Sequence, residues 1–120
     1  MIFFMVTQRP EAWTLLRRTL EEHGCTAELL PDMPRCLEAL RREPPDLVIL
    51  DLQLDGKELR EAIVSMLMVD ASVPCAVVST LPAEVFHDRM EGLGVLLSLP
   101  EGDSKDSAEA ILSALRRLNG

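Results

Sequence analysis

Asp51 is the residue of this 120-residue chain whose type and position most clearly suit chemistry. It follows the apolar run Leu47-Val48-Ile49-Leu50, which has the length and composition of a strand buried on both faces. In an open parallel sheet, ligands bind at the edge formed by the carboxyl ends of the strands. A carboxylate at that edge can serve as a nucleophile or a metal ligand. Ser79 and Thr80 follow a second apolar run and are expected at the same edge.

The elements that would position these groups alternate between strand and helix patterns, with no repeat, low-complexity tract or internal linker. Apolar runs typical of strands cover residues 2–6, 26–30, 47–51, 73–78 and 95–99. Helical spacing of apolar residues follows each run, after Pro10, Asp32, Gly56, Pro82 and Asp106. Five such units predict one α/β domain over residues 1–120. Its fold would be flavodoxin-like (βα)5, a parallel five-stranded sheet of order 2-1-3-4-5 with helices on both faces.

Four strand ends are expected to meet at the ligand edge of that sheet. They carry Thr7 and Gln8, Asp51, Ser79 and Thr80, and Leu99 and Pro100. Nearby, Trp13 lies on the apolar side of its helix and is expected to be a core or edge anchor. Asp32 is expected to cap the second helix, and Asp106 to open the last one as a capping box with Glu109.

Composition excludes several classes of function. The net charge of −8 opposes binding to nucleic acid or to an anionic membrane surface, and no apolar run approaches the length of a membrane span. The apolar start lacks the basic region of a signal peptide, so we expect a cytoplasmic protein. The three cysteines are odd in number and form no C-x-x-C pair, which favours reduced structural thiols over a disulfide framework or a zinc site.

Three segments resemble bacterial response-regulator receiver domains. Residues 46–59, DLVILDLQLDGKEL, resemble the third strand of that family and its following loop. Residues 73–80, VPCAVVST, are similar to its fourth strand, and Gly92 to Pro100 matches its Gly-to-Lys-Pro segment in length. The resemblance implies that Asp51 is the phosphoacceptor, which takes a phosphoryl group from a phosphohistidine. It also implies that the Ser79 hydroxyl contacts that group.

The rest of the family's phosphotransfer machinery has been replaced. Thr7 and Gln8 stand where two acidic residues hold Mg²⁺, so we expect magnesium binding to be weak or absent. Leu99 stands at the position of the lysine, whose charge-assisted contact to the phosphoryl group would be worth roughly 1.5–3 kcal/mol. Leu99→Lys is therefore expected to restore some phosphoryl affinity. With no like charges around Asp51, Asp51→Asn is expected to change stability by less than roughly 1 kcal/mol.

The loop after Asp51 also departs from the family. Asp55-Gly56 comes four residues after Asp51, which makes this loop three residues shorter than in the receivers that the chain resembles. Asp-Gly before a helix ordinarily forms a turn and cap, and the alternative is that Asp55 serves as a substitute metal ligand beside Asp51.

A contact surface is expected at the fifth strand. Receivers communicate through the face formed by their fourth helix, fifth strand and fifth helix, and their switch uses an aromatic residue where this chain has Leu96. Val95, Leu96 and Leu97 make this strand apolar, which favours a constitutive interaction surface. The expected partners are proteins: a histidine kinase, an output protein or a second copy of the chain.

The sequence therefore predicts an atypical receiver of two-component signalling that acts by protein–protein interaction, with weak or no phosphorylation and no catalytic residue of its own. The alternative is a conventional receiver phosphorylated on Asp51 by a histidine kinase. A flavodoxin-like enzyme or nucleotide binder is disfavoured, because Thr7-Gln8-Arg9-Pro10 lacks a glycine-rich phosphate loop. A phosphatase would require an acid where Gln53 stands.

Overall fold

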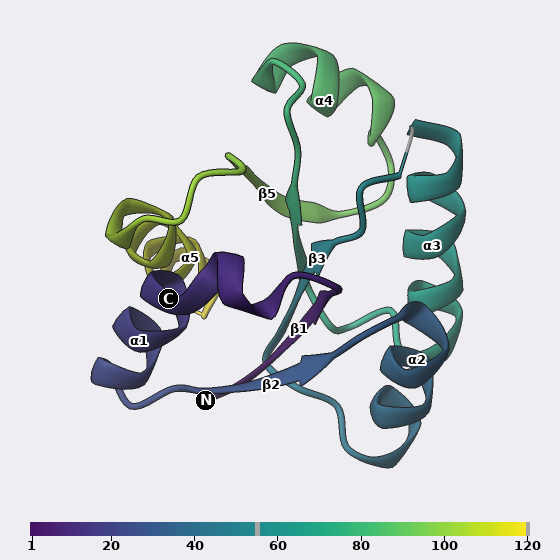
Figure 1. The fold of residues 1–120 in the computed structure, drawn as a ribbon. Coiled ribbons are helices and arrows are strands. Elements are labelled where there is room, and N and C mark those ends of the chain that lie inside the picture. The colour runs from purple at the N-terminus through teal and green to yellow at the C-terminus, as the bar shows by residue number, and fades with distance from the viewer. Residues whose placement is uncertain (55, 120) are drawn as a thin grey trace.

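The computed structural model describes residues 1–54 and 56–119. Their strands form one parallel sheet of order β2-β1-β3-β4-β5, as predicted, with α2 and α3 on one face and α1 and α5 on the other (Figure 1). In chain order the elements are β1 Ile2–Thr7, a 3-10 turn η1 Pro10–Trp13, α1 Thr14–Glu22, β2 Thr26–Leu30, α2 Met33–Arg42, β3 Leu47–Asp51, α3 Gly56–Val69, β4 Cys75–Val78, α4 Ala83–Arg89, β5 Val95–Leu99 and α5 Lys105–Asn119.

The central strands form because their side chains are buried on both faces of the sheet. Every residue of β3 is buried, and its side chains alternate between two apolar clusters. Val48 and Leu50 pack in the cluster that includes Ile63 of α3, whereas Leu47 and Ile49 pack in the cluster on the α1–α5 side. Full burial of an aliphatic side chain stabilises a fold by about 1.5–3 kcal/mol, so these runs determine which segments lie at the centre.

Helix starts follow the sequence prediction in one case and depart from it in another. Asp32 caps α2, since its Oδ1 accepts the backbone N–H of Arg35 at 2.9 Å. The predicted capping box at Asp106 is wrong. Helix α5 begins one residue earlier, at Lys105, and the Oγ of Ser104 accepts the backbone N–H of Ser107 at 3.2 Å. A serine hydroxyl just before the helix satisfies one of the free N–H groups, so no cap is required from Asp106.

The chain leaves helix α4 through two glycines with positive φ, Gly92 and Gly94. Arg60 of α3 donates to the carbonyl oxygens of Arg89 at 2.6 Å and Glu91 at 3.3 Å, which ties the end of α4 to α3. The pairing of β4 with β5 then skips Leu96, because Cys75 pairs with Val95 and Ala76 with Leu97. This irregularity lies in the edge strand, where bulges are common.

No helix in the described part of the chain is long and apolar enough to cross a bilayer. Cys25, Cys36 and Cys75 are buried and free, as expected for structural thiols. Burial raises the pKa of Cys36 to about 11 and that of Cys75 to about 12, so both thiols are protonated at neutral pH.

Candidate functional site

The Asp51 carboxylate lies at the carboxyl edge of the sheet with both oxygens hydrogen-bonded. The register of β1 and β3 pairs Thr7 with Asp51, which brings the two side chains together at the strand ends. Oδ2 accepts the Thr7 hydroxyl at 2.8 Å and the Trp13 indole N–H at 2.8 Å. Oδ1 accepts from Nη2 of Arg9 at 2.9 Å, and Nε of Arg9 lies 3.3 Å from Oδ2. Asp51 is only 4% exposed, so these groups replace its water.

Arg9 is held in place by the turn that follows β1. Its backbone N–H donates to the Thr7 hydroxyl oxygen at 2.9 Å, so Thr7 accepts from Arg9 while donating to Asp51. The side chain, 36% exposed, reaches back over the carboxylate in a forked geometry. With its amide oxygen turned toward the guanidinium, Gln53 accepts from Nη2 at 2.9 Å. Gln53 has φ +56°, a left-handed conformation that is uncommon outside glycine and that places it at this position.

Trp13 joins the polar site to the core. It is fully buried, as predicted for a core anchor, and packs in the cluster that contains Phe3 and Leu16. Its position in the 3-10 turn η1, before α1 begins, brings the indole N–H to Asp51. A buried indole N–H requires a hydrogen-bond partner, and the carboxylate provides one.

The electrostatics of the site favour an ionised Asp51. Burial by itself raises the pKa of this carboxyl group, but the hydrogen bonds from Arg9, Trp13 and Thr7 outweigh it and hold the pKa below the ordinary value. The same contact raises the pKa of Arg9 above its ordinary value. The pair therefore remains a buried carboxylate with a permanent cation against it.

Two other predicted pocket residues make no hydrogen bond to Asp51. Gln8 is exposed and borders a cavity of about 440 Å³ that Arg9, Asp51 and Gln53 also line. Leu99 is 2% exposed and packs in the core with Trp13, so its side chain does not line the cavities around Asp51. Of the three altered pocket positions Thr7, Gln8 and Leu99, Thr7 is the one with a hydrogen bond to Asp51. Asp55, proposed as a cap or a substitute metal ligand, lies outside the described residues.

Ser79 lies on the other side of Asp51. Both residues line a cavity of about 330 Å³, which Arg89 and Glu101 also border. The Ser79 Oγ accepts the backbone N–H of Leu81 at 3.1 Å and can still donate its own proton. The predicted hydroxyl is therefore close to Asp51, but the carboxylate oxygens are engaged by Arg9, Thr7 and Trp13. Within the described residues, no three His, Cys, Asp or Glu side chains gather to hold a metal ion.

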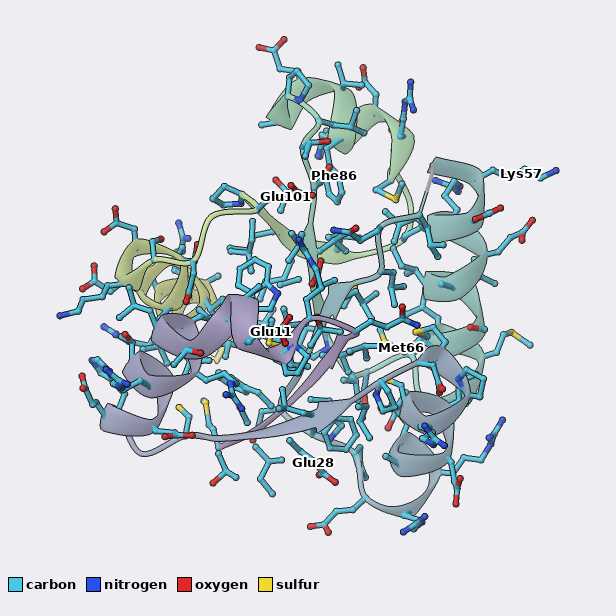
Figure 2. The ribbon with its side chains drawn as sticks, in the orientation of Figure 1. Glu11, Glu28, Lys57, Met66, Phe86 and Glu101 are labelled. Atoms are coloured by element: carbon cyan, nitrogen blue, oxygen red, sulfur yellow. The ribbon has the colours of Figure 1, made fainter. Side chains whose placement is uncertain are left out.

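The predicted contact surface is hollowed. Strand β5 is an edge strand, and Val95, Leu96 and Leu97 are half-buried. They line a cavity of about 560 Å³ together with residues of α4 and the turn after it, among them Phe86, Met90, Glu84 and Glu91. Figure 2 shows Phe86 below α4, on the side toward the sheet. The position of β5 at the sheet edge is confirmed, and its role in binding stays a prediction.

Comparison with protein-family models found no match, and comparison with curated proteins found none either. Solved structures are similar in fold. A response regulator from Thermotoga maritima has a TM-score of 0.83 at 18% identity, covering 96% of this chain and 97% of its own. The apo receiver domain of nitrogen regulatory protein C has a TM-score of 0.78 at 18% identity, covering 99% and 97%. A LuxR-family two-component response regulator from Aurantimonas reaches 0.76 at 21% identity, covering 97% and 85%.

The chain has the receiver-domain fold. The likeness covers nearly all of the chain, as the three matching sequence segments implied. Within this receiver fold, Asp51 and Ser79 lie near each other at the carboxyl edge, whereas Leu99 lies in the core.

Sequence reasoning missed Arg9 and Trp13 as partners of Asp51. They are 42 and 38 residues away in the chain, and no local pattern links them to it. One signal was available: a buried carboxylate deprived of its metal ligands and lysine still requires a cation, and Arg9 directly follows the altered acidic pair. That requirement could have singled out Arg9.

Proposed function

We propose that this protein is a receiver-type signalling domain that acts by binding a protein partner and does not require phosphorylation of Asp51. The observation that carries the proposal is the engagement of both Asp51 oxygens by Arg9, Thr7 and Trp13. A carboxylate that attacks phosphorus must offer a free oxygen. Here that oxygen would first have to lose charge-assisted hydrogen bonds, each worth roughly 1.5–3 kcal/mol.

Magnesium does not fit the residues present. Thr7 donates its proton to Asp51, and the guanidinium of Arg9 places a positive charge against the same carboxylate. A hard divalent cation prefers anionic oxygens and would face repulsion from that charge. Arg9 thus acts as an internal counter-ion, and we assign no metal-dependent or catalytic step to the site.

The partner surface in this proposal is the cavity between α4 and β5. Its apolar floor includes Phe86, Met90 and Leu96, and Glu84 and Glu91 border it. Because the chain carries a net charge of −8, the complementary partner is a protein segment with aliphatic side chains flanked by lysine or arginine. An output protein or kinase could carry such a segment.

The test is labelling by acetyl phosphate in the presence of magnesium, read by intact mass. We expect no adduct on the wild type, as on Asp51→Asn, which sets the background. Stoichiometric labelling of the wild type that Asp51→Asn abolishes would contradict the proposal. Gln8→Ala, a substitution at an exposed neighbouring position with no hydrogen bond to Asp51, is the matched control for changes near the site and should also give no adduct.

A second candidate is the conventional phosphoacceptor, favoured by the cavity that Asp51 and Ser79 share. In that case Arg9 must swing away to expose an oxygen. Arg9→Ala separates the two candidates. Equally efficient labelling of the wild type and of Arg9→Ala supports the conventional receiver. Labelling that occurs only in Arg9→Ala shows that Arg9 blocks phosphorylation of Asp51.

A further inference from the structure

Helix α1 takes its N-terminal cap from a distant loop. The residue before the helix, Trp13, provides no side-chain cap. Instead Asp103, in the loop between β5 and α5, accepts the backbone N–H of Leu15 at 2.8 Å and that of Leu16 at 2.7 Å. One carboxylate 87 to 88 residues away thus satisfies two of the free N–H groups at the start of α1 and faces its positive end.

The capped end of α1 is also the support of the Asp51 site. Trp13 directly precedes α1, and its indole donates to Asp51. Leu99, the last residue of β5, shares an apolar cluster with Trp13 and lies only four positions before Asp103. The end of β5 and the loop after it therefore meet the segment from η1 to α1 in two ways. Leu99 shares the apolar cluster of Trp13, and Asp103 accepts hydrogen bonds from the start of α1.

We propose that Asp103 is a positioning residue that links the β5–α5 loop, and not the surface cavity between α4 and β5, to the Asp51 site. By fixing the start of α1, Asp103 holds Trp13 at the distance from which its indole N–H reaches Asp51. Movement of the β5–α5 loop then loosens the indole hydrogen bond, and release of Asp51 loosens the start of α1. This route differs from one through Ser79 and an aromatic residue of β5, and it requires no phosphorylation.

The first test uses Trp13 as a probe, since it is the only tryptophan of the chain. Its indole resonance and the exchange rate of the indole proton are measured by NMR. In Asp103→Ala we expect a shifted resonance and roughly tenfold faster exchange, because loss of a helix cap favours local opening. Asp103→Asn retains one of the two oxygen acceptors, so it can cap one of the two N–H groups and should restore part of the wild-type protection.

The matched control is Asp70→Ala. Asp70 also accepts a backbone N–H, that of Ser72 at 2.9 Å, but it lies in the turn that precedes β4. An unchanged indole signal in Asp70→Ala, together with the change in Asp103→Ala, supports the proposal. An indole signal that stays unchanged in Asp103→Ala, or that moves equally in both variants, would overturn it.

A reciprocal measurement applies even if Asp103→Ala does not fold. Coupling between two sites acts in both directions, so Asp51→Asn should speed amide exchange at Leu15 and Leu16 by several-fold more than at Arg35, the capped amide of α2. Equal changes in amide exchange rate at the starts of α1 and α2 would show that Asp51 acts on global stability alone. That result would contradict the proposed role of Asp103.

Discussion

The Asp51 site and the α4–β5 cavity lie in the same receiver fold but differ in how fully their groups are satisfied. At the site, a buried carboxylate meets four donor atoms from three side chains and has no free oxygen. At the cavity, apolar side chains of an edge strand remain half-buried around about 560 Å³ of space. A closed polar site resists new chemistry, whereas an open apolar surface gains free energy when a partner covers it. The difference supports the proposed partner surface at β5.

The largest expected effect concerns Leu99, at the boundary of the two regions. Leu99→Lys should destabilise the protein by at least about 3 kcal/mol, because it places a charge in the buried apolar cluster in which Leu99 packs. The expectation from sequence that this substitution restores some phosphoryl affinity stays a prediction, and the core position of Leu99 adds a cost in stability. Urea denaturation measures the change. Leu99→Met, which keeps the volume, is the control and should cost under about 1.5 kcal/mol.

Asp51→Asn tests the closed site directly. Breaking a fully buried ion pair costs about 3–5 kcal/mol, and we expect about 2 because Arg9 is 36% exposed and asparagine retains one acceptor. The sequence alone led to an expected change in stability of less than roughly 1 kcal/mol for this substitution, because it did not reveal the contact between Arg9 and Asp51. Denaturation of Asp88→Asn, at an exposed position on α4, should show little change. A loss no larger than that of the control would mean that the ion pair adds nothing to stability.

Peptide binding tests the open surface. Two model amphipathic peptides with the same aliphatic face, one flanked by lysines and one by glutamates, are compared by fluorescence anisotropy. We expect the basic peptide to bind more tightly, and Leu96→Glu to weaken it by about tenfold through the charge placed in the apolar floor. Asp51→Ala should leave the affinity of the peptide unchanged. Loss of binding in a folded Asp51→Ala would show that binding at the α4–β5 cavity depends on Asp51, and would contradict the proposed function.

The smallest expected effect is a dependence of stability on acid pH. The folded-state pKa of Asp51 lies below its ordinary value of 3.8, so its contribution is complete above that value and is lost as pH falls toward the folded-state pKa. Stability should therefore decline below about pH 4, and Asp51→Asn should remove part of this slope. Hydrogen bonds from Ser72 also lower the pKa of Asp70. Asp70→Asn should therefore remove a different part of the pH dependence of stability, and it is the variant with which Asp51→Asn is compared. Equal slopes for the wild type and Asp51→Asn would contradict a lowered pKa.

Local sequence pattern was enough to predict the strands, the sheet order and the place of Asp51, because each depends on apolar periodicity within a short segment. The continuous apolar run before Asp51 can be satisfied only by a central strand, and the alternation of strands with helices leaves one common parallel topology. Asp32 was predictable as a cap for the same reason, since its partner Arg35 lies three residues away.

The partners of Asp51 and the cap of α1 depend on contacts between segments that are far apart in the chain. Arg9 and Trp13 reach Asp51 across 42 and 38 residues, and Asp103 reaches α1 across 88. The pattern around Asp51 is compatible with either a free phosphoacceptor or a closed ion pair. The tertiary structure shows Asp51 in the ion pair, because the turn after β1 brings a cation and an indole N–H to a carboxylate that burial would otherwise leave unpaired.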